Sequence, residues 1–189
     1  MPNWCNNTIT LTGPKAKITK IYEKAKEDNA FLQQLHPMPT ELEDTTKGSN
    51  GDADNWYDWR VENWGTKWDV DMDGLELSDD GTTISGWFDS AWSPPIHAYE
   101  TFLTENEDCS ISSLYYEGGM DFAGKWEDFA DMTVTPGDFT ADEMEDPNSG
   151  LIYDINEQFN MSEWVREYEE EQKTDTERFI VDKEAVNGW

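Results

Sequence analysis

Four aspartates are spaced in a way that suits a hard cation. Asp69, Asp71 and Asp73 alternate along the chain, a glycine follows at the sixth position of the segment, and Asp80 stands at the twelfth. A calcium-binding loop presents carboxylates in this order, and its glycine allows a sharp turn. Two details oppose a complete site: Glu76 takes a position that is usually apolar, and an aspartate replaces the bidentate glutamate. We expect a turn with solvated carboxylates that binds cations weakly at most, and we predict no cofactor.

A second set of candidate residues lies between four tryptophans in residues 56–69, WYDWRVENWGTKWD. Two basic residues there could bind an anion while a carboxylate acts as acid or base. Alternatively, these polar groups pair with one another and with Asn3, Asn6 or Asn7, because buried charge persists only when it is paired. We favour this structural interpretation, and we expect the segment's tryptophans to be largely buried, Trp59, Trp64 and Trp68 above all. The polar set consists of Arg60, Glu62, Asn63, Lys67 and Asp69, with Glu117 near another motif.

Two cysteines and two histidines offer the remaining candidates for chemistry. Cys5, Cys109, His36 and His97 lack the close paired spacing of structural zinc sites. A cysteine–histidine nucleophile would need only spatial proximity, but no local sequence supports one. We expect Cys5 to be a small buried hydrophobe, as free cysteine usually is. The sequence therefore names no catalytic residue.

Five segments of the chain are distinctive motifs. They are MPNWCNN (1–7), LHPMPTEL (35–42), WYDWRVENWGTKWD (56–69), FDSAWSPP (88–95) and the weaker YYEGGMDFAG (115–124). In these motifs the chain resembles the YubB-like or Api-type ferredoxin-like domain family of bacteriophages and plasmids. This resemblance implies a split βαβ sandwich, a small accessory protein and a cytoplasmic setting, and it implies no activity.

The periodicity of the chain predicts the elements that would position these residues. Apolar residues alternate in residues 8–13 and 110–116, as in half-buried strands, and they recur at helical spacing in residues 15–28. The order β-α-(insert)-β-β-α-β is the split βαβ pattern. We predict an α+β fold, a ferredoxin-like split βαβ sandwich in which two helices cover an antiparallel sheet. The further predictions are a hairpin of 75–77 with 82–88, a helix at 96–103, a domain at 1–124 with an insert at 30–68, and an acidic extension at 125–189 docked on that domain.

The net charge of −29 is the strongest compositional signal. A surface of this charge repels phosphate backbones, so direct nucleic-acid binding is unlikely. It suits either a protein that binds a basic protein surface or one whose acidity is an adaptation to salt or for solubility. No apolar run is long enough to cross a bilayer, and residues 1–10 lack the features of a signal peptide.

The acidic extension offers the surface that we expect to face such a partner. Asn160 and Glu163 have the spacing of a capping box before a short helix. Trp164, Val165 and Tyr168 form its narrow apolar stripe, by which it would dock on the domain. The residues predicted to bind the partner are Asp142, Glu143, Glu145, Asp146, Glu167, Glu169, Glu170 and Glu171.

Charge and resemblance together favour a non-enzymatic phage accessory protein that binds a basic protein surface through its acidic face. One form of this function is a DNA-mimicking inhibitor of a host or defence factor. Two alternatives stay open: a virion-associated or assembly protein, and a small-ligand binder or enzyme that uses Arg60, Asn63, Lys67 and Asp69. The expected location is the cytoplasm of the bacterial host, or the virion.

Overall fold

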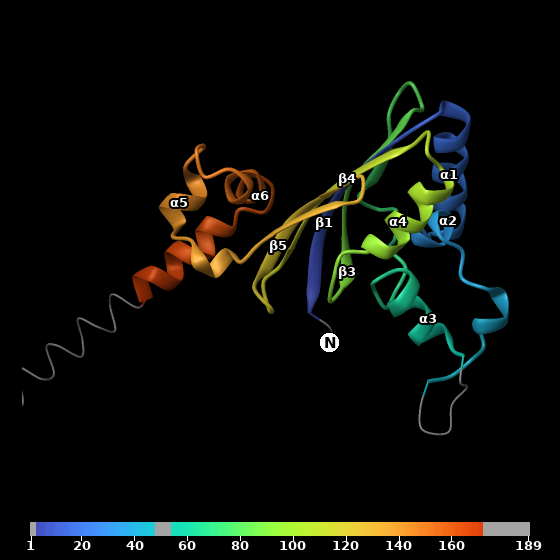
Figure 1. Ribbon diagram of the computed structural model, residues 1–189, viewed down its shortest axis with the longest axis horizontal. Helices are drawn as coiled ribbons and strands as arrows, with labels where there is room; N and C mark the ends of the chain where they lie inside the picture. Colours follow the sequence, from blue (N-terminus) through green and yellow to red (C-terminus); the bar gives the residue numbers. More distant parts are fainter. Residues whose placement is uncertain (1–2, 48–53, 172–189) are drawn as a thin grey trace, which may run out of the picture. The chain divides into compact units, whose positions relative to one another are not determined.

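The computed structural model describes residues 3–47 and 54–171 of this α+β protein (Figure 1). The chain forms two compact units, residues 1–134 and residues 135–189. The first unit holds a six-stranded sheet with several helices, and the second is built from short helices. Each unit is described by itself below.

Six antiparallel strands form the sheet of the first unit. Their order is β2-β3-β1-β4-β5-β6, and every neighbouring pair is antiparallel. The hairpin predicted from the sequence is confirmed as β2 paired with β3. The strands are β1 (Trp4–Thr12), β2 (Leu75–Leu77), β3 (Thr83–Ala91), β4 (Ser110–Glu117), β5 (Phe122–Glu127) and β6 (Ala130–Val134).

The first unit continues past the boundary that we expected at residue 124. That position lies inside β5, where Gly124 is paired with Tyr115 of β4. Strand β6 then pairs with β5, and the compact unit ends at residue 134. The hairpin of β5 and β6 therefore belongs to the sheet and not to the acidic extension.

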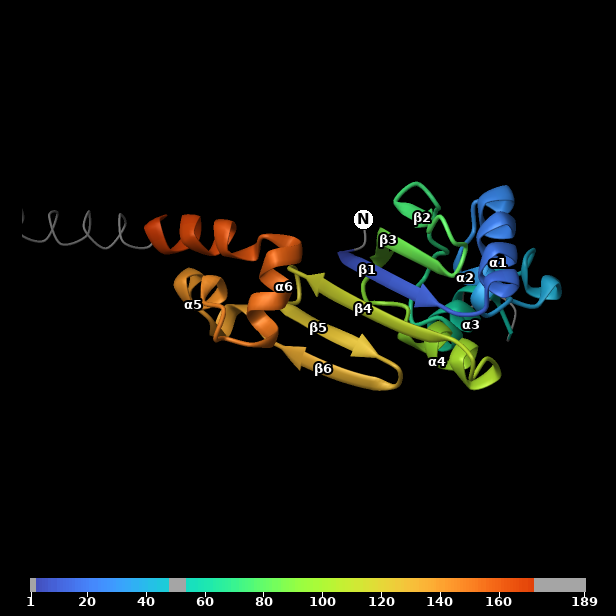
Figure 2. The same cartoon turned by 90° about the horizontal axis from the view of Figure 1, so that it is seen from above.

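Helices α1, α2 and α4 lie on one face of this sheet (Figures 1 and 2). The amphipathic helix predicted at residues 15–28 is confirmed as α1, and α4 begins directly after Pro95, as expected. The expected insert at 30–68 contains two short helices and one 3₁₀ turn. The elements are α1 (Lys15–Asp28), α2 (Leu32–Leu35), η1 (Thr40–Leu42), α3 (Trp56–Asn63) and α4 (Ile96–Glu105).

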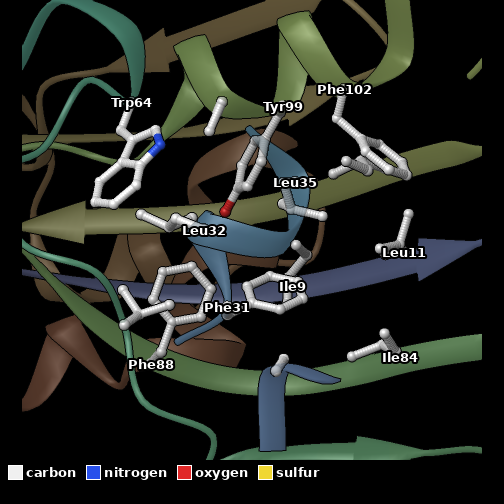
Figure 3. Packing of buried hydrophobic residues seen from close by; sticks show 14 of the residues in the cluster. Ile9, Leu11, Phe31, Leu32, Leu35, Trp64, Ile84, Phe88, Tyr99 and Phe102 are labelled. Carbon is white, nitrogen blue, oxygen red and sulfur yellow. The ribbon is translucent and has the colours of Figure 1, made fainter. Parts of the chain in front are cut away.

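The main core fills the space between the sheet and these helices (Figure 3). Side chains alternate along β1, so Ile9 and Leu11 are buried while Thr10 on the opposite face is exposed. Ile9 and Leu11 meet buried residues from the helices, among them Leu32 and Tyr99. Burial of this apolar surface is the main term that stabilises the unit.

The described part of the second unit contains η2 (Pro136–Asp138), α5 (Ala141–Glu145), α6 (Leu151–Phe159) and a helix over residues 161–171. Its buried apolar residues include Met144, Ile152, Ile155, Met161 and Val165. The described part of the chain contains no helix with the length and apolarity that crossing a membrane requires.

Helix starts in the second unit differ from the prediction. A complete capping box joins Thr140 and Glu143 at the start of α5, where we did not expect one. At the expected position, Asn160 is the left-handed C-cap of α6, and its side-chain amide donates to the Glu163 carboxylate over 2.6 Å. The backbone N–H of Ser162 donates instead to Oδ1 of the buried Asn156, at 2.7 Å.

Candidate functional site

Trp64 is the anchor of the tryptophan-rich segment. It is fully buried, and its indole N–H donates to the backbone oxygen of His36 over 2.7 Å. Trp59 packs edge-on against Trp64 and stacks on the His36 ring, with ring centres 5.1 Å apart. Trp59 and Trp68 are only half-buried, so the expected burial is confirmed for Trp64 and is wrong in extent for the other two. Helix α3 presents one side of this segment to solvent, which leaves its rings partly exposed.

The predicted polar set does not converge on one pocket. The Arg60 guanidinium lies over the rings of Trp56 and Trp64, 5.3 and 4.8 Å from their centres. Burial lowers the pKa of Arg60, while the charge of Asp69 opposes this shift. The side-chain amide of Asn63 donates to the backbone oxygen of Trp59. Glu62 is exposed, and its backbone oxygen lies 2.9 Å from Nδ1 of His97.

Asp69 has a structural task that the sequence did not reveal. Its carboxylate accepts hydrogen bonds from the backbone N–H groups of Leu32, Gln33 and Val70, at 2.7, 2.9 and 2.8 Å. These bonds satisfy N–H groups at the start of α2, which would otherwise lack partners. Burial raises the pKa of Asp69, and the three backbone bonds act in the opposite direction. Asp69 therefore ties the insert to the segment before β2.

The aspartates of the calcium-like spacing bond separate parts of the backbone: Asp69 caps α2, whereas Asp71 and Asp80 serve two different turns. The Asp71 carboxylate accepts the backbone N–H of Asp73, and Asp80 accepts bonds from Ser78 and Thr82 in the loop between β2 and β3. These bonds lower the pKa of Asp80 to about 2. Strand β2 separates this loop from the other three aspartates. Within residues 3–47 and 54–171, no three or more His, Cys, Asp or Glu residues gather in an arrangement that could hold a metal ion.

Cys5, a residue of β1, is buried within a polar network. Burial raises the pKa of its thiol to about 12, and the negative charge of Glu117 adds to this shift. The Asn7 amide donates to the Cys5 carbonyl and to the Ser90 hydroxyl, at 2.8 and 2.9 Å. A thiol with this pKa is protonated at neutral pH and is a poor nucleophile. Asn7 thus serves this network and not the polar set of residues 56–69. Asn6 also bonds outside that set, because its exposed side chain donates to Asp89.

Glu117 is buried and closes the turn between β4 and β5. Its two carboxylate oxygens accept the backbone N–H groups of Gly119 and Met120, at 2.8 and 2.7 Å. These two hydrogen bonds give the buried Glu117 carboxylate its partners, which could not be assigned from the sequence. Glu117 is therefore a turn-forming residue within the family-like motif of residues 115–124.

A hollow of about 370 Å³ opens beside β3, where this strand runs past the end of β2. We call it the tryptophan–aspartate hollow. Its rings are those of Trp4, Trp68 and Trp87, and its carboxylates include those of Asp71, Asp73, Asp89 and the capping residue Asp69. Trp4 is 47 % exposed and Trp87 is 61 % exposed, which is unusual for the largest apolar side chain.

Lys67 lies next to this hollow among aromatic rings. Its ammonium is 4.4 Å from the Trp68 ring centre and 5.5 and 5.7 Å from those of Tyr57 and Trp92. Each ring attracts a cation through its negative face. Trp92 adopts a left-handed backbone conformation with φ 73°, a strained state for a bulky residue. Lys67, one of the two basic residues considered as an anion site, therefore lies in an aromatic cage.

Sequence reasoning missed the most exposed aromatic residues of this site. The alternation of exposed Trp87 and Asp89 with buried Phe88 and Ser90 is the signal that could have placed them on the outer face of β3. Trp4 is the exposed neighbour of buried Cys5 in the same way. These residues come together because β1 and β3 pair, with Trp4 opposite Ala91.

The predicted partner-binding acids occupy the second unit, and many of them already have intramolecular partners. Arg166 reaches Asp142 at 3.3 Å and Glu145 at 2.7 Å. Glu143 closes the capping box, and Asp146 accepts bonds from Asn148. Hydrogen bonds to these partners lower the pKa of Glu143, Glu145 and Asp146.

Other acids of this unit line a surface hollow of about 390 Å³ around Arg166. Glu167 belongs to it, as predicted, and so does Glu163, which we had assigned only to a cap. Glu169 is half-buried, and its carboxylate accepts the backbone N–H of Ala141 at 3.4 Å. Of the apolar stripe, Val165 is buried within the unit, whereas Trp164 and Tyr168 are 40 % and 57 % exposed. The acids that line the hollow are Glu145, Glu163, Glu167 and Glu170.

Comparison with models of known protein families, with curated proteins and with solved structures gives no match for this chain.

Proposed function

We propose that this protein is a non-enzymatic binding module that recognises a basic protein surface. The observation that carries the proposal is the pairing of Arg166 with two carboxylates. Its guanidinium is held by Asp142 and Glu145 from α5, inside a hollow whose rim carries further glutamates. The second unit thus already binds one arginine of its own chain through paired carboxylates, the geometry that suits a guanidinium.

The overall charge supports a basic partner. Carboxylates far outnumber lysines and arginines, with 42 against 13 in the sequence. Several of those cations are engaged within the protein: Lys17, Lys24, Lys47 and Lys125 each pair with a carboxylate. A field of this sign accelerates encounter with a positively charged surface and disfavours nucleic acid.

The proposal includes the fold type and the biological setting. Strands β1 to β4 have the order β2-β3-β1-β4, helix α1 follows β1 and helix α4 connects β3 with β4. This order supports the fold type that we propose, the split βαβ arrangement of a ferredoxin-like domain. Together with the resemblance of residues 1–124 to the YubB-like or Api-type family, it supports a phage or plasmid accessory protein of the bacterial cytoplasm. A DNA-mimicking inhibitor is one function of this kind.

The ligand-binding alternative has less support from the geometry. Arg60 and Asn63 make contacts within the tryptophan-rich segment, and Lys67 lies over three rings. Asp69 borders the tryptophan–aspartate hollow, but its oxygens cap α2. The contacts of these four residues are therefore ones of packing and capping, and they differ from the mutual pairing that the structural interpretation expected.

The proposal is tested by binding to a basic protein probe, for which a histone H1 tail peptide is suitable. The variant Glu163→Gln/Glu167→Gln/Glu170→Gln removes three charges around the second-unit hollow. The matched control is Glu76→Gln/Asp79→Asn/Glu107→Gln, which removes three exposed charges from the first unit. Affinities are measured by calorimetry at ~50 and ~200 mM NaCl. The Debye length is about 14 Å at the lower concentration and shorter at the higher one.

The full chain should bind the probe at low salt and lose affinity steeply at the higher salt concentration. The variant at Glu163, Glu167 and Glu170 should lose more affinity than the control variant, because the three charges that it lacks lie around one hollow. Absence of binding at ~50 mM salt would contradict the proposal of a basic partner. Equal losses in the two variants would show that total charge, and not the second unit, is recognised.

A further inference from the structure

We propose that the tryptophan–aspartate hollow of the first unit is a binding site for an arginine side chain of a partner protein. This inference rests on the proposed function, because it specifies which cationic group the basic partner presents. It concerns a site in a different unit from the acidic hollow around Arg166. Four observations point to this ligand: the exposed rings, the carboxylates beside them, a free strand edge and the neighbouring lysine cage.

The rings of Trp4, Trp68 and Trp87 form one wall of the hollow, and exposure of this apolar surface to water is unfavourable unless a ligand covers it. Trp87 is 61 % exposed and Trp4 is 47 % exposed, and the Trp4 and Trp68 ring centres lie 5.8 Å apart. Gly74 allows the Trp87 ring to lie close to the backbone just before β2, since a Cβ there would collide with the ring and the carbonyl oxygen of Trp87. The protein therefore holds these large apolar surfaces in a fixed place facing solvent, as binding surfaces do.

Carboxylates stand at the edge of this aromatic wall. Asp71, Asp73 and Asp89 are all exposed and line the same hollow. Asp89 receives a bond from the Asn6 amide on one oxygen, at 2.7 Å, which fixes its orientation and leaves its charge uncompensated. A cation that enters would meet aromatic faces and negative charge together.

The backbone of β3 contributes hydrogen-bonding groups at the same place. Trp87 donates its N–H to the Gly74 carbonyl, and the N–H and C=O of Ala91 both bond the Thr66 hydroxyl. Backbone groups of alternate residues point to the same edge of an antiparallel strand. The peptide groups of Asp89 therefore point to the edge of β3 that borders the hollow, where a bound segment could pair with them.

The chemistry favours a guanidinium over an ammonium. A guanidinium is planar and weakly hydrated, stacks on tryptophan and donates to a carboxylate through two parallel N–H groups. Lys67 shows that rings of this region hold a cation, since its ammonium lies among Tyr57, Trp68 and Trp92. That cage is filled by the chain's own lysine, whereas the hollow on the side of Trp4 and Trp87 has space for a partner's side chain.

The test uses the full chain and three acetylated peptides of alternating glycine with arginine, lysine or neutral citrulline. Calorimetry at ~50 mM NaCl gives affinities, and the indole N–H resonances in NMR spectra show which rings are contacted. The variants are Trp87→Ala and Asp89→Asn. The matched controls are Trp164→Ala, another exposed tryptophan, and Asp79→Asn, another exposed aspartate.

The arginine peptide should bind most tightly and shift the indole signals that Trp87→Ala and Trp4→Phe assign. Each hollow variant should weaken it about fivefold, as expected for one cation–π contact or one ion pair, and each control less than twofold. Circular dichroism confirms folding, and Asp89→Asn retains the shape of the side chain if Trp87→Ala is disturbed.

If Trp87→Ala and Asp89→Asn both bind the arginine peptide as tightly as the wild type does, the tryptophan–aspartate hollow is not the binding site. The proposed function would still stand. Equal affinity for the lysine peptide would overturn the assignment of a guanidinium. Binding of the citrulline peptide as tightly as the arginine peptide would show that the hollow does not recognise a cation. If neither the arginine peptide nor the basic probe binds at low salt, the site and the proposed function fail together.

Discussion

At the scale of single residues, most aspartates that could bind a ligand hold the backbone in place. Asp69 caps α2, Asp71 bonds the N–H of Asp73, and Asp80 organises the loop between β2 and β3. Short side chains with two acceptor oxygens bond nearby N–H groups readily, so aspartates collect at turns and caps. The same property makes a series of aspartates look like a metal site in a sequence.

Asp80 gives a test of this role through pH. Its carboxylate accepts bonds from the N–H and hydroxyl of Thr82 and from the hydroxyl of Ser78, and these lower its pKa from 3.8 to about 2. Because the folded-state pKa is depressed, the contribution to stability is fully present above pH 3.8 and is lost as the pH falls through about 2. The variant Asp80→Asn should therefore melt at a lower temperature than the wild type near pH 6.

The difference in melting temperature, measured by circular dichroism, should shrink as the pH falls below 3.8 and be lost below about pH 2. Asp79→Asn is the control for the loss of one negative charge: this exposed neighbour has no such set of bonds, so its melting temperature should not fall below that of the wild type at any of these pH values. A difference for Asp80→Asn that is the same at pH 6 and at pH 2 would show that charge is not the cause.

At the scale of elements, periodic segments were predictable and long-range caps were not. Helix α1 and the hairpin of β2 and β3 follow from local patterns of 3.6 and 2 residues. Strand β6 was missed because four of its five residues are exposed, so it has no alternation to read. The cap of α2 was missed because Asp69 lies 37 residues from Leu32 along the chain.

The candidate site shows the same division. Residues 56–69 stood out by composition, and the burial of Trp64 was correctly predicted. The tryptophan–aspartate hollow was not predicted, because Trp4, Trp68 and Trp87 come from three segments that meet only when β1 and β3 pair. Sequence distance hides a site of this kind, whereas residues of one segment are recognised together.

Asn156 allows a test of how the second unit is held together. Its side chain is buried, and Oδ1 accepts the N–H of Ser162 at the start of the helix over residues 161–171. Asn156→Ala leaves that N–H without its partner, which costs about 1–3 kcal/mol for a buried group. Hydrogen exchange of residues 161–171 should become faster in this variant.

The control is Gln158→Ala, a change at an exposed position of the same helix α6 that should leave exchange unchanged. Exchange in β1 and β4 of the first unit serves as an internal reference in both variants. Equal protection of residues 161–171 in the wild type and in Asn156→Ala would show that Asn156 does not act as a cap. Equally fast exchange after Gln158→Ala would show that the effect is not specific to Asn156.

At the scale of the whole molecule, the net charge of −29 acts on every fold and binding equilibrium. Like charges at this density repel one another and destabilise the compact state. Ion pairs such as Lys24 with Glu27 and Asp28 are exposed, and each contributes little. Screening should therefore relieve more repulsion than it removes attraction.

The melting temperature should accordingly rise between ~20 and ~500 mM NaCl, because the Debye length shrinks from over 20 Å to about 4 Å. The variant Glu76→Gln/Asp79→Asn/Glu107→Gln should melt higher than the wild type at low salt and gain less from added salt, since it starts with fewer charges. Calcium and magnesium chloride at equal ionic strength should raise the melting temperature equally, because Asp69, Asp71 and Asp80 bond separate parts of the backbone. A much larger effect of calcium, abolished by Asp71→Asn, would instead reveal a specific site there. A melting temperature that is independent of salt would show that repulsion within the acidic surface does not destabilise the fold. There would then be no physical reason to expect a basic partner to stabilise the protein.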